Sequence, residues 1–152
     1  MFRKLKELAL KLLKDGLSPG KIALGIAVGI AIGNFPLYGP STIMCLLAIA
    51  LFRLNTPLVL AGHYSMTFVK PFLILPFLRI GEFVFRAEPL PLDLVALTRQ
   101  FKADAWGTLQ EFGWSFLHAV VGWCVMLPLM VGGIYLVVKP MVVKWQALRV
   151  KD

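Results

Sequence analysis

Two long stretches of the chain carry no charged side chain, and they set the pattern of the whole sequence. One runs from Ile22 to Phe52 and the other from Phe112 to Val138. Uninterrupted apolar stretches of about 18 residues or more are typical of helices that cross a membrane. The second stretch, flanked by Trp114 and Lys139, therefore predicts a transmembrane helix.

The first stretch contains its own break. A straight helix over it would be about 46 Å long, against a hydrocarbon core of about 30 Å. Between Gly33 and Thr42 the chain has two prolines, two glycines and an asparagine, through which a regular helix does not continue. We therefore expect two half-length helices that meet at a polar elbow, as a re-entrant hairpin rather than two thin full crossings. Irregular backbone at membrane depth is tolerated only inside protein or beside water, so the elbow should be sheltered.

Three further segments have the periodicity of helices. Residues 2–14 combine apolar positions at helical spacing with lysines, which predicts a basic amphipathic helix. Leu58 to Leu78 predicts another transmembrane helix, kinked by Pro71 and Pro76. Residues 94–109 predict an interfacial helix, because apolar side chains recur every three or four positions opposite charged ones.

The predicted fold class is an all-α integral membrane protein, built as a Pro/Gly-broken helical hairpin with two transmembrane helices and two interfacial amphipathic helices. We expect a single membrane domain, since the length leaves no room for a second. Its expected parts are the basic amphipathic helix (1–17), the broken hairpin with the first span (18–81), a connector with the interfacial helix (82–111), and the last span with a basic tail (112–152).

The composition excludes several classes of protein. Hydrophobic residues make up 59% of the chain and charged residues 16%, against roughly 45–50% and 25% in soluble domains. This argues against a soluble enzyme, a secreted disulfide scaffold and a free nucleic-acid-binding module. Cys45 and Cys124 lie in the apolar stretches, where they are expected to be packing residues.

The charge distribution predicts a topology. Sixteen Lys and Arg against eight Asp and Glu give a net charge of +8, with the cations gathered in residues 1–21 and 139–151. The segment 79–111 is nearly neutral. Cations favour the cytoplasmic side, so both termini are expected in the cytoplasm and the connector outside. Because the cations flank apolar stretches, the expected partners are membrane lipids with anionic head groups rather than nucleic acid.

Gly25, Gly29 and Gly33 recur four residues apart in the first half-helix. Small residues at this spacing let another helix approach closely. The partner helix is expected within the same chain, and a second copy of the chain or another membrane protein is the alternative.

No catalytic set can be found in the sequence. His63 and His118 each stand alone, and no nucleotide-binding or metal-ligand spacing is present. We therefore expect no cofactor and no metal, and regard an enzyme as less favoured than a binding protein.

The elbow and the helix after it form the best candidate ligand site. If Pro40 begins the second half-helix, its free N–H groups and positive dipole end can bind an anion. A lysine inside an apolar stretch costs about 2.5–3.5 kcal/mol, and Lys70 would suit a phosphate. The residues predicted to bind an anionic head group are Asn34, Tyr38, Ser41, Thr42, His63, Thr67 and Lys70. The last three are expected on one helical face, at i, i+4 and i+7.

A structural interpretation of the same residues is also open. Lys70 could extend its ammonium to the membrane surface, and the polar side chains of the elbow could do no more than satisfy the broken backbone.

The spacing of glycines and prolines resembles a known family. The residues that carry the resemblance are Ser18-Pro19, Ile22 to Gly25, Gly29, Gly33, Pro36, Gly39, Thr42, Arg53, Asn55, Pro57 and Gly62. Over residues 18–81 the chain is similar to the prokaryotic membrane domain of unknown function numbered 2062. The sequence departs from that pattern at Ser41, where the family usually has Gln, and at Thr67 to Lys70, where it has an Asn-Pro-Leu-Thr stretch.

The resemblance implies a bacterial inner-membrane protein of multiple passes, sometimes fused to glycosyltransferase-like domains and without an established activity. Together with the elbow, it leads us to expect a protein that handles or transports an anionic lipid or a lipid-linked phosphate. The alternative is a structural or accessory subunit that docks into a larger membrane complex through its glycine stripe.

Overall fold

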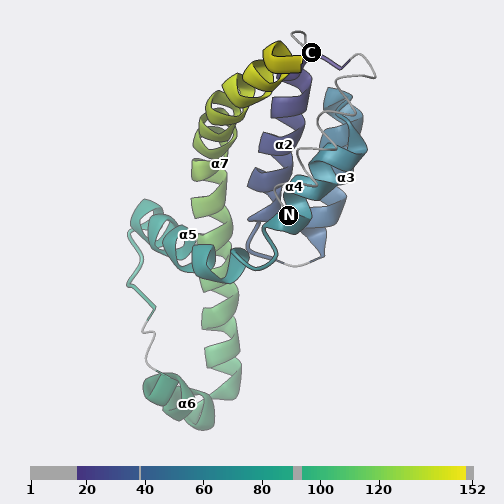
Figure 1. Cartoon of the computed structure of the whole chain (residues 1–152). Coiled ribbons are helices and arrows are strands. Elements are labelled where there is room, and N and C mark those ends of the chain that lie inside the picture. Colours follow the sequence, from purple (N-terminus) through teal and green to yellow (C-terminus); the bar gives the residue numbers. More distant parts are fainter. Residues whose placement is uncertain (1–16, 38, 91–93, 150–152) are drawn as a thin grey trace.

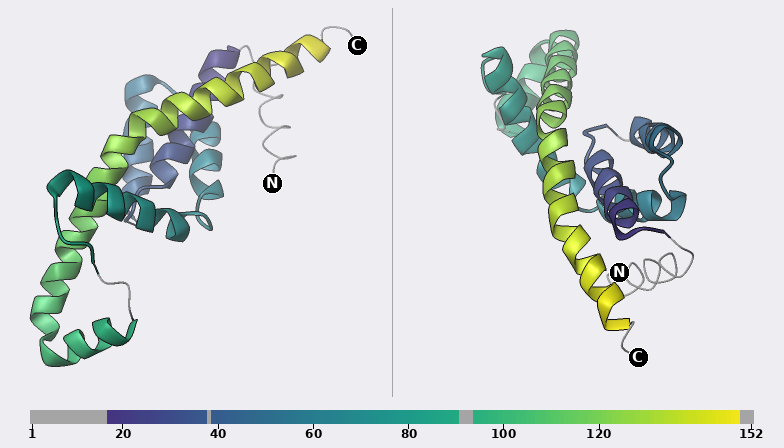
Figure 2. Two further views of the ribbon diagram at one scale, coloured as in Figure 1. Left: turned by 90° about the vertical axis from the view of Figure 1, so that its left-hand side faces the viewer. Right: turned by 90° about the horizontal axis from the view of Figure 1, so that it is seen from above.

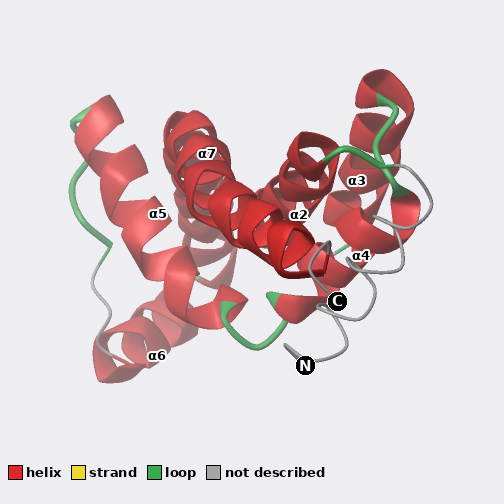
Figure 3. Ribbon diagram, turned by 45° about the horizontal axis from the view of Figure 1, so that its top comes forward, coloured by secondary structure: helices red, strands yellow, loops and turns green. Residues whose placement is uncertain are grey.

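The computed structural model describes residues 17–37, 39–90 and 94–149, and these form helices and no strands (Figures 1 and 3). The predicted amphipathic helix at residues 2–14 lies outside the described part of the chain. The described helices are α2 (Pro19–Gly33), α3 (Pro40–Phe52), α4 (Thr56–Ser65), α5 (Lys70–Phe85), α6 (Leu94–Ala103) and α7 (Ala105–Arg149).

Proline in the first turn and a polar cap define the starts of α2 and α4. The Ser18 hydroxyl accepts a hydrogen bond from the N–H of Lys21 at 3.4 Å, and the Asn55 side chain accepts one from Leu58 at 3.3 Å. Proline is favoured at such positions because its missing N–H would have no helical partner. The chain turns between α3 and α4 at Arg53, which adopts a left-handed φ of 49°.

Helices α2, α3 and α4 run in alternating directions, so that α2 and α4 are parallel and in contact. The glycine stripe of α2 faces α4: Gly29 lies against the backbone of Val59 and Gly33 against that of His63. A β-carbon at Gly29 would overlap the Val59 carbonyl oxygen. Glycine is therefore required for this close approach, and the partner of the stripe is a helix of the same chain.

Helix α7 covers the neighbouring face of α2. The indole N–H of Trp123 donates to the Ala31 carbonyl at 2.9 Å, and its ring meets Phe35 edge-on with centroids 5.0 Å apart. Near the other end of α2, Val142 of α7 packs with Ile22. The predicted elbow thus lies at the level of Trp123, and the start of α2 lies at the level of Val142.

Helix α5 crosses α7 in close contact (Figure 2). At the crossing Gly81 faces the backbone of His118, and Gly122 faces the backbone of Phe77. No side chain fits between the two backbones at these points, which fixes where the helices meet.

One of the two predicted transmembrane helices is wrong. Leu58 to Leu78 is not continuous: α4 ends at Ser65, the chain turns through Met66–Val69, and α5 begins at Lys70. Pro71 has no N–H to donate to the carbonyl four residues earlier, so it ends the helix instead of only kinking it. Among the described residues, one helix is long and apolar enough to cross a membrane, over Trp106–Ala147 within α7.

The predicted interfacial helix is interrupted as well. Helix α6 ends at Ala103, and Asp104 begins α7 by accepting a hydrogen bond from the N–H of Gly107 at 2.9 Å. A carboxylate at this position satisfies free N–H groups of the first turn. Helix α7 therefore begins before the predicted span of Phe112 to Val138, and it also continues beyond that span to Arg149.

Candidate functional site

Five buried polar side chains gather where α2, α3, α4 and α5 meet, and we call them the polar cluster. Its members are Asn34 (4% exposed), Ser41 (2%), Cys45 (0%), His63 (7%) and Lys70 (3%). Four of the five were expected to bind a head group, and Cys45 was expected only to pack.

Each member of the polar cluster is positioned by the end or the inner face of a helix. Asn34 is the C-cap of α2, and Ser41 and Cys45 lie one turn apart on the buried face of α3. His63 lies in the last turn of α4, where its backbone touches Gly33. Lys70 is the first residue of α5, and its N–H donates to the Met66 carbonyl at 2.8 Å. The break at Met66–Val69 therefore turns the lysine inward.

The electrostatics of the polar cluster are unusual for a buried site. Lys70 lies within electrostatic range of both His63 and Cys45. The sequence from Gly16 to Gly81 contains no Asp or Glu, so no carboxylate of this region can neutralise the lysine. Burying a charge is costly unless neighbouring groups or a bound ion compensate it.

Two buried side-chain atoms of the polar cluster have no hydrogen-bond partner, Oδ1 of Asn34 and Nδ1 of His63. Buried polar atoms are nearly always satisfied in folded proteins, so such exceptions need an explanation. Oδ1 of Asn34 is an acceptor and needs a hydrogen-bond donor, whereas Nδ1 of His63 can accept or donate according to its tautomer.

The start of α3 adds donors beside the polar cluster. Gly39 precedes it with a φ of 92°, which favours glycine, and no side chain caps the helix. Pro40 is its first residue, as predicted. The positive end of the helix dipole therefore lies next to the buried Ser41.

The remaining predicted site residues stand apart from this group. Thr42 is half-buried, and its N–H donates to the Gly39 carbonyl at 3.2 Å. Thr67 is exposed in the turn after α4, so it does not share a helical face with His63 and Lys70. Tyr38 lies outside the described residues. Lys70, at 3% exposure, does not extend to the surface as the structural interpretation required.

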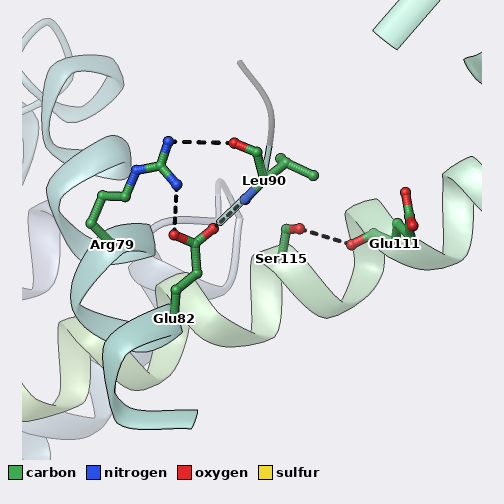
Figure 4. Close-up of polar contacts among 5 residues, drawn as sticks. All are labelled: Arg79, Glu82, Leu90, Glu111 and Ser115. Atoms are coloured by element: carbon green, nitrogen blue, oxygen red, sulfur yellow. Dashed lines mark hydrogen bonds and ion pairs between the residues drawn. The ribbon is translucent and has the colours of Figure 1, made fainter. Parts of the chain in front are cut away.

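A second buried charge was missed by sequence reasoning. Glu82 of α5 is 4% exposed and accepts hydrogen bonds from Arg79 at 2.7 Å and from the Leu90 N–H at 2.9 Å (Figure 4). Arg79 also donates to the Leu90 carbonyl at 3.3 Å. We call these three residues the clasp, because they hold the segment after α5 against that helix. The i, i+3 spacing of Arg79 and Glu82 was the available signal.

The outer face of α3 is strongly apolar and uncovered. Ile43 is 62% exposed, Leu47 58% and Leu51 76%, whereas Ser41, Cys45 and Ala48 form the buried side. This helix therefore separates the polar cluster from an apolar exterior with a single layer of side chains.

The comparisons with known proteins identify the family. The family model described as an uncharacterized protein conserved in bacteria (DUF2062) matches residues 2–151, so the chain belongs to this bacterial family. Neither the curated proteins nor the solved structures contain a match to this chain.

Proposed function

We propose that this chain is a membrane protein that accommodates the phosphate of an anionic lipid, or of a lipid-linked phosphate, in the polar cluster. The observation that carries the proposal is the buried Lys70, which lies within electrostatic range of Cys45 and His63 in a stretch of sequence without any carboxylate. An anion held there would offset the cost of burying the ammonium group.

The exposed surface of α7 supports a membrane location. Core helices of soluble proteins can be as apolar as α7, but they are mostly buried. The apolar window of α7 has a mean hydropathy of 2.1, and only 11% of it is buried inside the chain. Together with the exposed apolar face of α3, this leaves more uncovered apolar surface than soluble monomers tolerate.

The positions along α7 at which it contacts the two ends of α2 support a location of the polar cluster deep in the hydrocarbon core. Trp123 meets the elbow, and Val138 packs with Ile22 near the start of α2. At 1.5 Å per residue these levels are about 23 Å apart. If Lys21 and Lys139 lie at one membrane surface, the elbow lies about three-quarters of the way through a hydrocarbon core of about 30 Å. This favours the re-entrant hairpin.

The groups of the polar cluster match a phosphate. The Lys70 ammonium group provides charge, and the Ser41 hydroxyl, the Asn34 amide and the His63 imidazole can each donate a hydrogen bond. The positive end of the α3 dipole also favours an anion. A lipid could approach from the side of α3, whose outer face is apolar.

The alternative role, an accessory subunit docked through the glycine stripe, has less support. Gly29 and Gly33 are covered by α4 of the same chain. A partner protein would have to use another surface.

The test is a titration of short-chain phosphatidic acid into the full chain, purified in a non-ionic detergent. Lys70→Met removes the charge and keeps the length of the side chain. It should weaken binding of phosphatidic acid at least tenfold, because the charge-assisted hydrogen bonds to phosphate are lost.

Lys102→Met is the matched control, since Lys102 is an exposed lysine of α6, and it should bind phosphatidic acid as the natural chain does. Inorganic phosphate is titrated in parallel to distinguish a lipid site from a site for free phosphate. Equal binding of phosphatidic acid by the natural chain and by Lys70→Met would contradict the proposal.

A further inference from the structure

A polar hollow lies beside the crossing of α5 and α7, far from the polar cluster. It measures about 300 Å³, and its polar lining includes Glu88, Gln100, Glu111, Trp114 and His118. None of the described residues that line it is a lysine or arginine. Gln100 donates a hydrogen bond to one carboxylate oxygen of Glu111, which leaves the other oxygen for a ligand. Two carboxylates and an exposed indole ring form an environment for a cation.

An apolar groove of about 160 Å³ adjoins this hollow between α5 and α7. Leu78, Phe112, Phe116 and Ala119 contribute to its lining, and polar atoms contribute none of its exposed surface. The groove and the hollow share Leu90 and Ser115. Figure 4 shows Leu90 between the Arg79–Glu82 pair of α5 and the Ser115–Glu111 face of α7.

A third hollow adjoins the first at Pro89 and carries the opposite charge. Arg79 and Arg86 line it together with Glu82, whose charge Arg79 already neutralises. The Arg79 side chain is 43% exposed, and its two hydrogen bonds in the clasp use only part of its five donors. Guanidinium groups are well suited to a phosphate.

We propose that this place binds an aminophospholipid of the phosphatidylethanolamine class. Its ammonium group lies with Glu88 and Glu111, its phosphate with Arg86 and the free donors of Arg79, and one acyl chain enters the apolar groove past Leu90. The three hollows meet around Pro89 and Leu90: Leu90 lines the groove and the acidic hollow and its carbonyl accepts a hydrogen bond from Arg79, and Pro89 lines both charged hollows. An anionic lipid without an amine would bring no cation to compensate the charges of the two carboxylates.

The position along α7 agrees with a head-group site. His118, at the crossing, is 21 residues before Lys139, which corresponds to a rise of about 32 Å. This matches the thickness of the hydrocarbon core, about 30 Å. The crossing therefore lies at the second membrane surface when Lys139 lies at the first. The inference rests on the proposed membrane crossing of α7 and does not depend on the polar cluster.

The experiment is native mass spectrometry of the full chain in a mild detergent, titrated with phosphatidylethanolamine, phosphatidylglycerol and free phosphoethanolamine. We expect phosphatidylethanolamine to bind at least tenfold more tightly than phosphatidylglycerol. The double variant Glu88→Gln/Glu111→Gln should abolish this preference, and Ser115→Phe should weaken binding of either lipid by narrowing the junction between the hollow and the groove.

Asp104→Asn is the matched control, because asparagine caps a helix as aspartate does and the change removes one negative charge outside the groove. It should keep the preference. The inference is overturned if the two lipids bind equally to the natural chain, or if the double variant keeps the preference. Phosphoethanolamine binding as tightly as the lipid would also overturn it, because the apolar groove would then have no role. Lys70→Met serves to separate the two proposals, since it should leave this preference intact.

Discussion

The two ends of α5 each bury a charge, and they do so in opposite ways. At the C-terminal end Glu82 is neutralised by Arg79 and receives the Leu90 N–H, so its charge is compensated within the chain. At the N-terminal end Lys70 lies within electrostatic range of the Cys45 thiol and the His63 imidazole, and the sequence has no carboxylate between Gly16 and Gly81. Both side chains are less than 5% exposed.

This difference separates a structural charge from a candidate binding charge. Breaking a buried ion pair destabilises a protein because one partner is left without compensation, whereas replacing a buried cation by an apolar side chain of similar length removes its desolvation cost. The clasp should therefore behave as part of the fold, and Lys70 should behave as part of a site. Three measurements of the stability of the folded chain test this distinction.

The largest effect is expected at the clasp. Glu82→Ala should lower the free energy of unfolding by about 3 kcal/mol, because Arg79 and the Leu90 N–H both lose their acceptor. The measurement is thermal unfolding of the purified chain in detergent. Glu82→Gln keeps an oxygen for the Leu90 N–H and should lose less. An unchanged melting temperature in Glu82→Ala would contradict the structural role of the clasp.

An intermediate effect is expected from a ligand at the polar cluster. Phosphatidic acid at 100 times its dissociation constant should stabilise the natural chain by about 2.7 kcal/mol, as expected for a ligand that binds only the folded state. Phosphatidic acid should not stabilise Lys70→Met, and it should stabilise Glu82→Gln by as much as it stabilises the natural chain. Equal stabilisation of all three proteins would place the lipid elsewhere.

The smallest effect should have the opposite sign to the first. Without lipid, Lys70→Met is expected to raise the free energy of unfolding by about 1 kcal/mol, because a methionine of similar length replaces a desolvated cation. Thermal unfolding of the lipid-free chain measures it. A loss as large as that of Glu82→Ala would show Lys70 to be a structural residue.

The parts of the fold that follow local rules could be predicted from the sequence. Ser18-Pro19 and Asn55-Thr56-Pro57 carry the cap and the first-turn proline of α2 and α4, and the run from Gly33 to Pro40 predicted the elbow, because caps, prolines and glycines act on their immediate neighbours. Four residues of the polar cluster were found for a related reason: polar side chains inside an apolar stretch require a buried setting.

The features that depend on distant segments could not be predicted. Leu58 to Leu78 has the length and apolarity of a span, and its break at Met66–Val69 becomes useful only because it turns Lys70 toward α3 and α4. Glu82 was assigned to an exposed connector, since its second partner, the Leu90 N–H, is eight residues away. The roles of Gly81 and Gly122 depend on a crossing that neither local sequence contains.

At that crossing α5 contacts the backbone of α7 over one helical turn, from Phe77 to Gly81. At Gly81 the backbone rests directly on α7, without side chains that could slide or reorient. Pro76 lies between this support and Lys70 and provides no N–H to the carbonyl of Phe72. The segment that carries the buried ammonium group is thus joined to the contact at Gly81 through a turn that lacks one helical hydrogen bond, and a change in the orientation of Lys70 relative to α7 is expected to begin at that turn.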